Sequence, residues 1–236
     1  TRYISVTGVQ TCALPIFLRC KNDPVYFAKN YIKIVNVDDG LVNFNMWPFQ
    51  EKLIKNFHHN RFNICKMPRQ VGKSVTTVSY LLHYVLFNDN VNIGILANKA
   101  STSRELLGRL QLSYENLPKW MQQGITSWNK GSLELENGSK IIAASTSASA
   151  VRGMTFNIIF LDEFAFVPNH IADDFFSSVY PTISSGKTTK VIIVSTPKGM
   201  NHFYRMWHDA ERGRNEFVPT EVHWSEVPGK IGRAHV

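Results

Sequence analysis

The sequence has 236 residues, of which 44% are hydrophobic and 19% charged, and it carries a formal net charge of +8. This length and apolar content are sufficient for one large or two small cores, which excludes a disordered tail and a fibrous protein. No run approaches the roughly 18 apolar residues that a membrane helix needs, so the composition predicts a soluble protein with no membrane partner. The three cysteines follow no spacing typical of a disulfide framework or a zinc site.

Both ends of the chain differ from its middle. Residues 1–16 lack the long apolar stretch of a signal peptide and resemble the translation of a sequencing-library adapter, as do residues 230–236. Back-translation of the last seven residues with the adapter's codons gives a reverse complement that encodes the sequence found at residues 11–17. We therefore expect neither end to carry fold or function, and we interpret the chain as a reading frame cut at the adapter. Without the three basic residues of these ends the net charge is +5, which is compatible with a polyanionic partner but does not require one.

Between residues 17 and 228, short β-rich runs alternate with helical stretches, which is typical of a single α/β domain with a largely parallel sheet flanked by helices. Strands are predicted at 62–66, 91–97, 157–161, 190–194 and 216–224, and helices at 74–87, 102–117 and 203–212. The dipeptide Asn137-Gly138 favours a tight turn, which predicts an antiparallel hairpin of 133–135 with 140–143. Thr102 and Glu105 have the spacing of a capping box, which predicts that a helix begins at Thr102.

The segment 67–74 has the second half of a phosphate-binding loop, between a predicted strand and a predicted helix. In such loops backbone N–H groups at a helix N-terminus hold phosphate oxygens, a lysine reaches the β- and γ-phosphates, and a hydroxyl binds Mg²⁺. Lys73 and Ser74 have the residue types for the last two roles. On this motif alone, an ordinary helix N-terminus is the alternative.

The rest of this loop is unusual in composition. Met67 stands where the usual first glycine would be, and Pro68 removes one N–H donor. The remaining candidates for nucleotide contacts in the loop are Arg69, Gln70 and Gly72.

Two adjacent acids follow the apolar run 158–161. Asp162 and Glu163 would lie at the carboxyl edge of the sheet, where open α/β sheets bind ligands. Asp162 can hold magnesium, directly or through water, and Glu163 can orient and polarise the water that attacks a γ-phosphate. The alternative is a pair of acids that stabilises a following helix N-terminus.

Two further sites are typical of a nucleotide-driven motor. Ser195 and Thr196 end another apolar strand, where their hydroxyls could sense a γ-phosphate. Trp47 precedes the first strand and could stack on adenine, while the amide of Gln50 could read the edge of the base. Each of these is, by itself, more often an ordinary strand end or helix start.

Together these residues resemble the ATPase domain of the large terminase subunit of tailed bacteriophages. The similarity covers roughly residues 24–224 and rests on the segments 68–74, 94–97, 128–132, 150–153, 161–163 and 195–199, which follow the family's order. A glycine-poor phosphate loop that contains Arg69 and Gln70 is itself typical of this family.

The resemblance implies a P-loop NTPase of the additional-strand, catalytic-glutamate type, with ATP and Mg²⁺ as cofactors. It implies that Lys73 and Ser74 bind phosphate and magnesium, that Asp162 assists the metal, and that Glu163 is the catalytic carboxylate. Ser195 and Thr196 match the family's coupling motif. Gln50 matches its adenine-reading glutamine.

The same resemblance implies a motor that drives double-stranded DNA into a preformed capsid. Its expected partners are the DNA, the phage portal protein, the small terminase subunit and further copies of itself in a ring. The expected location is the host cell cytoplasm, with transient docking on the portal of the procapsid. The family's nuclease domain, which follows the ATPase domain, is expected to be absent from this chain.

Arginines complete the expected site. Arg152 lies ten residues before Asp162, and Gly153 would let the backbone turn tightly and present the guanidinium outward. Arg152 is therefore our candidate for an arginine that reaches a neighbouring subunit's nucleotide. Arg69 is the competing candidate and would act within its own subunit, and the remaining interpretation is that Arg152 only anchors its loop.

Two other functions compete with the packaging ATPase. A helicase-like translocase would need a second RecA-like domain, for which the chain is too short, and a non-hydrolysing nucleotide-binding module would not need Glu163.

Three basic residues have two open interpretations. Contacts to DNA phosphates and a solvated helix face are equally consistent with Lys99, Arg104 and Arg109.

Overall fold

A computed structural model describes residues 10–36, 38–147, 153–184 and 186–228. Its helices are α1 (Gln10–Asn22), α2 (Pro24–Tyr31), α3 (Pro48–His59), α4 (Lys73–Phe87), α5 (Ala100–Glu115), α7 (Asn169–Ser184) and α8 (His202–Glu211), with the short 3-10 helices η1 (Phe164–Phe166) and η2 (Trp224–Glu226). Its strands are β1 (Lys33–Asn36), β2 (Gly40–Asn43), β3 (Phe62–Lys66), β4 (Asn92–Ala97), β5 (Ile125–Trp128), β6 (Ser132–Leu135), β7 (Lys140–Ser145), β8 (Ile158–Asp162), β9 (Lys190–Ser195) and β10 (Val218–Glu221).

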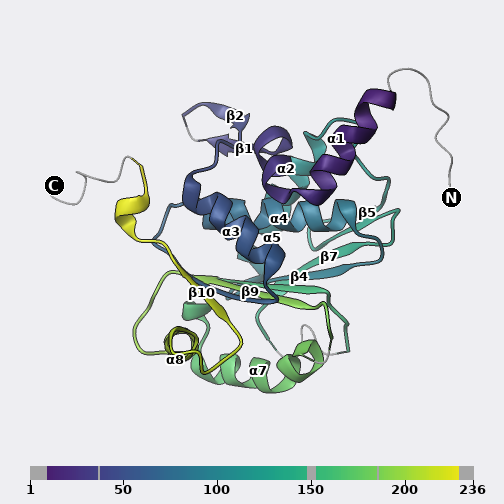
Figure 1. Cartoon of the computed structure of the whole chain (residues 1–236). Coiled ribbons are helices and arrows are strands. Elements are labelled where there is room, and N and C mark those ends of the chain that lie inside the picture. Colours follow the sequence, from purple (N-terminus) through teal and green to yellow (C-terminus); the bar gives the residue numbers. More distant parts are fainter. Residues whose placement is uncertain (1–9, 37, 148–152, 185, 229–236) are drawn as a thin grey trace.

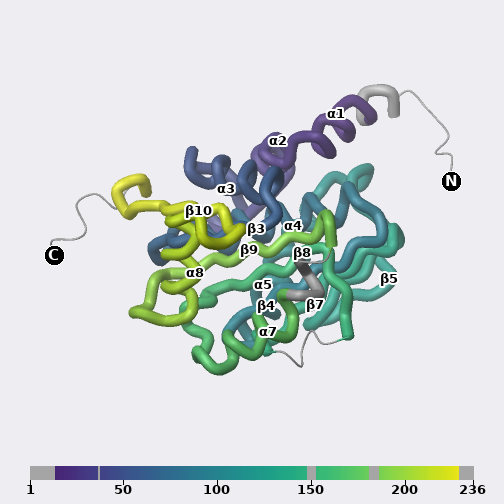
Figure 2. Tube along the Cα trace, turned by 60° about the horizontal axis from the view of Figure 1, so that its bottom comes forward, coloured from purple at the N-terminus to yellow at the C-terminus, as the bar shows by residue number. Residues whose placement is uncertain are grey.

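One large sheet organises the described ranges. Its eight strands lie in the order β10-β3-β9-β8-β4-β7-β6-β5, and Figure 2 shows β10 and β5 at opposite sides of the molecule. Neighbours from β10 to β7 run parallel, whereas β6 and β5 add antiparallel pairs at one edge. The predicted α/β fold with a largely parallel sheet flanked by helices is confirmed.

Helices cover both faces of this sheet (Figure 1). Helices α1 to α5 lie on one face and α7 and α8 on the other. Because side chains alternate along a strand, β8 sends Ile158 and Phe160 into the first core and Ile159 and Leu161 into the second. All residues of β8 are buried, as the uninterrupted apolar run predicted.

The parallel pairing brings the predicted site residues to one edge of the sheet. In the register, Lys66 at the end of β3 pairs with Ser195 at the end of β9. Asp162 at the end of β8 pairs with Val194 on one side and with Ala97, the last residue of β4, on the other. The segments that follow these strands therefore meet at a single carboxyl edge.

Most predicted elements lie within a few residues of their observed positions. The strands β3, β4, β8 and β9, the helices α4 and α8, and the β6–β7 hairpin are confirmed, while β10 is shorter than the predicted strand. The hairpin turn includes Gly138 with φ of +78°, in the left-handed region that favours glycine.

The prediction that a capping box begins a helix at Thr102 is wrong. Helix α5 begins at Ala100, its N-cap is Lys99, and the Thr102 N–H donates to the Lys99 carbonyl inside the first turn. Glu105 pairs instead with Arg109 on the helix surface. Only Asn98 and Lys99 separate the end of β4 from the helix, so the short connection sets its start.

The N-terminal end also differs from expectation. Residues 10–16 form the first part of α1, so the expectation that residues 1–16 contain no folded element is wrong for this part. Ile16 packs against the first core, and the ring of Phe17 lies 5.1 Å from that of Phe87, which anchors the helix. No helix in the described ranges is long and apolar enough to cross a membrane.

Candidate nucleotide-binding site

The phosphate loop connects β3 to α4. Met67 is buried and donates its N–H to the carbonyl of Ser195 at 3.0 Å, which ties the start of the loop to the end of β9. Gln70 and Gly72 both have positive φ values, of 57° and 69°. This left-handed backbone turns the chain into α4 with Gly72 as the N-cap, so that Lys73 and Ser74 occupy the first helical turn.

Gln50, on α3, supports the phosphate loop through a hydrogen bond. Its side chain is only 3% exposed; its Oε1 accepts from the Trp47 N–H at 2.9 Å, and its Nε2 donates to the Val71 carbonyl at 3.2 Å. The φ of Gly72 favours glycine, and a Cβ there would lie 2.5 Å from that same Nε2, so the Gln50 amide would have to move. Both polar atoms of the amide thus have partners within the chain, and the adenine-reading role of Gln50 stays a prediction.

Lys73 lies between the loop and the ends of β8 and β9. Its side chain is 8% exposed, and its ammonium forms an ion pair with Glu163 and donates to the Thr196 hydroxyl at 2.7 Å. The other oxygen of Glu163 accepts from the Thr196 N–H at 3.1 Å. A buried ion pair needs such additional hydrogen bonds to offset the cost of removing both charges from water.

Ser195 fixes the segment that carries Glu163. The backbone of Glu163 is left-handed, with φ of 50°, which is strained for a residue with a side chain. The N–H of Ala165, two residues later, donates to the Ser195 hydroxyl at 3.0 Å. This contact holds the turn after β8 against β9, so the predicted coupling residues Ser195 and Thr196 both contact the segment with the carboxylate.

The carboxylate of Asp162 is suited to bind a metal ion. Its side chain is 3% exposed, and its Oδ1 is buried without a hydrogen-bond partner among the described residues. Burial, and to a smaller extent the charge of Glu163, raises the pKa of this carboxyl to about 7. A buried, unpartnered carboxylate oxygen beside a phosphate loop is suited to a divalent cation, and Ser74 supplies a hydroxyl in the same loop. The residues therefore fit Mg²⁺, held by Ser74 and Asp162.

These groups surround a cavity of about 530 Å³, which we call the phosphate cavity. Its polar lining residues include Arg69, Gln70, Lys73, Ser74, Asn98, Lys99, Thr102, Arg109 and Glu163. Four cationic side chains and one carboxylate thus line it among the described residues. Such a balance, next to the N-terminus of α4, favours a polyanion over a neutral ligand.

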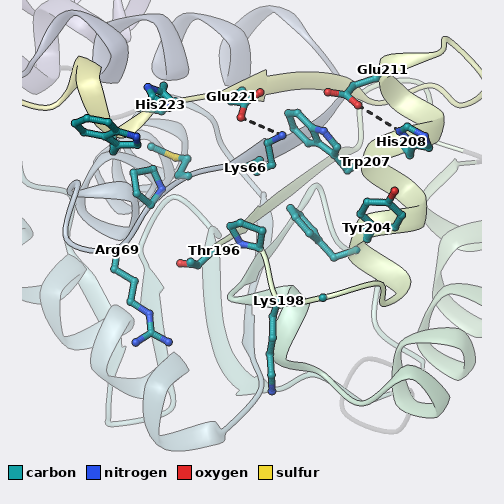
Figure 3. A pocket seen from close by; sticks show the side chains of 17 residues that line it. Lys66, Arg69, Thr196, Lys198, Tyr204, Trp207, His208, Glu211, Glu221 and His223 are labelled. Carbon is teal, nitrogen blue, oxygen red and sulfur yellow. Dashed lines mark hydrogen bonds and ion pairs between the residues drawn. The ribbon is translucent and has the colours of Figure 1, made fainter. Parts of the chain in front are cut away.

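A second hollow, the aromatic cavity, lies on the other side of the loop (Figure 3). Its volume is about 670 Å³, and α8 and the end of β10 line it with Tyr204, Trp207, Glu211 and Glu221. Lys66 pairs with Glu221 at 3.0 Å and lies 4.6 Å from the centre of the Trp207 ring. Two of the sequence motifs also reach it, because residues 67–69 of the phosphate loop and residues 196–199 after β9 line this cavity.

The structure brings together most of the residues predicted from the sequence. Arg69, Gln70, Gly72, Lys73, Ser74 and Glu163 line the phosphate cavity. Asp162, Ser195 and Thr196 lie at its strand ends, and Gln50 lies behind the loop. Arg152 lies outside the described residues.

Several lining residues had no predicted role in a nucleotide site, among them Phe166 and Arg109. Phe166, in η1, has its ring centre 5.9 Å from the guanidinium of Arg69 and 4.8 Å from the ammonium of Lys198. Arg109 comes from the third turn of α5, far from the loop in sequence. Neither lies in a motif, so only the packing of η1 and α5 against the loop reveals them.

A phosphate loop at a carboxyl sheet edge, with acids on the next strand but one, defines a P-loop ATPase domain. Residues 64–229 match the family described as terminase large subunit, T4likevirus-type, N-terminal, and the chain belongs to this family. Membership of this family identifies the chain with terminase large subunits, ATP binding and phage DNA packaging.

Solved structures share this fold. The chain is 19% identical to the large terminase of bacteriophage HK97, with a TM-score of 0.70, covering 85% of this chain and 43% of that one. It is 20% identical to the large terminase ATPase domain of Thermus phage P74-26, with a TM-score of 0.60, covering 73% and 81%. It is 14% identical to the large terminase of a thermophilic bacteriophage in complex with ATP-gamma-S, with a TM-score of 0.59, covering 77% and 46%. The chain thus spans less than half of the first and the third of these proteins.

Proposed function

We propose that this domain hydrolyses ATP with the help of Mg²⁺ and that it uses Glu163 as the general base. The observation that carries the proposal is the pairing of Lys73 with Glu163 in one cavity at the N-terminus of α4, directly after the buried Asp162 at the end of β8. The large terminase of the thermophilic bacteriophage has been solved with ADP and with ATP-gamma-S, which supports nucleotide binding by this fold.

Each residue has a distinct task in this reaction. The ammonium of Lys73 and the first N–H groups of α4 hold the β- and γ-phosphates. Ser74 and Asp162 hold Mg²⁺, which neutralises part of the triphosphate charge. Glu163 orients the attacking water and accepts its proton. Because Lys73 now pairs with Glu163, the γ-phosphate must replace the carboxylate as the partner of Lys73 before Glu163 can act as a base.

Ser195 and Thr196 would report this exchange to the rest of the domain. Thr196 contacts both Lys73 and Glu163, so separation of the ion pair changes its hydrogen bonds at the end of β9. This is a physical basis for the coupling role that the family resemblance assigns to them.

An arginine would neutralise the charge that develops on the γ-phosphate. We propose Arg152, acting on a neighbouring subunit in a ring, with Arg69 as the competing residue within the subunit. Arg152→Ala subunits should be inactive alone and regain activity when mixed with Glu163→Gln subunits, because an intact arginine then meets an intact carboxylate. Failure of every mixing ratio, in preparations shown to form rings, would favour Arg69.

Family membership supports a wider role. We propose that hydrolysis drives double-stranded DNA into the procapsid, with the portal protein, the small terminase subunit and a ring of identical subunits as partners, in the host cytoplasm. Double-stranded DNA should then stimulate phosphate release by the protein. Stimulation by single-stranded DNA alone would favour a helicase-like translocase.

Phosphate release with and without Mg²⁺ tests the reaction, with Glu163→Gln as the matched variant. The variant keeps the shape of the side chain but cannot accept a proton, so turnover should fall about 10²–10⁴-fold while ATP binding persists. Equal turnover in both proteins would remove Glu163 as the base. Binding without turnover in the unaltered protein would make the domain a nucleotide-binding module.

A further inference from the structure

The phosphate cavity has a second positively charged wall that the proposed reaction does not use. Lys73, Ser74 and Arg69 line the cavity from the phosphate loop and the start of α4, and Lys99 and Arg109 line it from the N-cap and the third turn of α5. The two sets of residues come from consecutive strand–helix units, because β4 and α5 follow α4 in the chain. A ligand bound at the phosphate loop would thus face Arg109.

The direction of the Arg109 side chain suits such a contact. Side chains on a helix point back towards its N-terminus, and the N-terminus of α5 lies at the same carboxyl edge as the phosphate loop. The guanidinium therefore extends from the third turn towards the cavity. It is also close enough to Asp162 for its positive charge to lower the pKa of that carboxyl, against the larger effect of burial.

The present partner of Arg109 is a weak one. Its guanidinium contacts Glu105, one turn earlier on the same helix, at 2.6 Å, and both side chains are about half exposed or more, at 49% and 64%. Exposed ion pairs of this spacing contribute little to stability, so a dianionic phosphate group can displace Glu105.

We propose that Arg109 contacts the terminal phosphate of a bound nucleoside triphosphate, from α5 and not from the helix α4 that carries Lys73, and leaves Glu105 to do so. The proposal rests on the proposed function, since it places the triphosphate in the phosphate cavity. It makes Arg109 a residue that distinguishes the triphosphate from the diphosphate.

Arg104 provides a matched control on the same helix. It is exposed, donates from its Nε to the carbonyl of Ala100 at 3.1 Å, and is not among the residues that line the phosphate cavity. Arg104→Gln and Arg109→Gln remove the same charge from α5, but only Arg109→Gln removes it from the cavity.

The test is a calorimetric titration of the chain with ATPγS and with ADP, both in Mg²⁺. Arg109→Gln should weaken ATPγS binding at least about tenfold and change ADP binding less than about twofold, because only ATPγS carries the terminal phosphate. Arg104→Gln should change neither. Glu105→Gln should leave ATPγS binding equal or tighter, because it removes the competing carboxylate.

The other outcomes separate this inference from the proposed function. An equal loss for both nucleotides, or no loss, in Arg109→Gln would overturn the contact while leaving the ATPase assignment intact. Weaker binding of double-stranded DNA, with an unchanged ratio of ATPγS to ADP affinity, would overturn it in favour of a DNA contact. Failure of the unaltered protein to bind either nucleotide would overturn the proposed function, and this inference with it.

Discussion

Two cavities flank the phosphate loop and share Arg69, yet their linings differ in kind. The aromatic cavity is the larger, at about 670 Å³ against about 530 Å³. Lys66 pairs with Glu221 and lies over the Trp207 ring, and Arg69 and Lys198 also line this hollow, beside aromatic side chains and two carboxylates. The phosphate cavity instead combines a helix N-terminus, four cations and the single carboxylate of Glu163, and the buried Asp162 ends the strand before it. Volume therefore does not identify the nucleotide site, whereas the chemistry of the lining does.

The largest expected effect is a loss of stability when the aromatic cavity is altered, with nucleotide binding unchanged. Trp207 is 5% exposed and packs in the second core, so Trp207→Ala should lower the free energy of unfolding by about 3–5 kcal/mol. Calorimetric titration at a temperature where the variant is folded should show unchanged ATPγS affinity. A selective loss of ATPγS binding by the folded variant would mean that the aromatic cavity takes part in nucleotide binding.

The second prediction tests the cations of the two cavities against each other. Lys73→Ala should cost about 2–5 kcal/mol of ATPγS binding free energy, because it removes a buried cation that faces the phosphates. Lys66→Ala removes a lysine from the aromatic cavity and should leave binding unchanged. Equal losses in the two variants, measured by the same titration, would contradict the distinction between the cavities.

The third prediction concerns the helical face, away from both cavities. Burial lowers the pKa of His83 to about 4, and its Nε2 donates to the Cys20 carbonyl at 2.9 Å. As pH decreases, the imidazole of His83 therefore binds a proton in the unfolded chain before it does so in the folded protein. The free energy of unfolding should fall as pH decreases from about 6.5 to about 4, by at most about 1.4 kcal/mol per pH unit. In His83→Gln, which keeps a donor but does not titrate, denaturant unfolding should show a smaller slope. An unchanged slope would assign the acid sensitivity to other groups.

The smallest effect is expected at Gln50. Its amide accepts at the start of α3 and donates to the phosphate loop, so Gln50→Ala should cost about 1 kcal/mol of stability. The predicted adenine reading adds a loss of ATP binding that GTP binding does not share, whereas equal losses would leave Gln50 with a supporting role alone. Competition titrations with the two nucleotides distinguish the roles. A loss for ATP that spares GTP would support adenine reading by Gln50.

The sequence was sufficient to predict much of the site because of one property of the fold. The β-branched runs before Asp162 and Ser195 form buried parallel strands, and parallel strands place their carboxyl ends at one edge. Residues distant in sequence therefore meet once the strands are identified. Lys73, Glu163 and Thr196 are in contact for this reason.

Other features depend on packing that no local pattern encodes. Arg109 lines the phosphate cavity because α5 packs beside α4. Gln50 supports the phosphate loop because α3 brings its amide to the Val71 carbonyl. The start of α5 at Ala100 follows from a short connection that overrides the capping signal at Thr102. The helix that includes residues 10–16 contacts the core through Ile16 and Phe17, which the sequence pattern did not indicate.

A crystal structure of the protein with ATPγS and Mg²⁺ tests the central claim most directly. The account predicts that the phosphates lie in the phosphate cavity, beside the first turn of α4, and that the ion pair between Lys73 and Glu163 is separated. Phosphates bound in the aromatic cavity, with that ion pair intact, would contradict it.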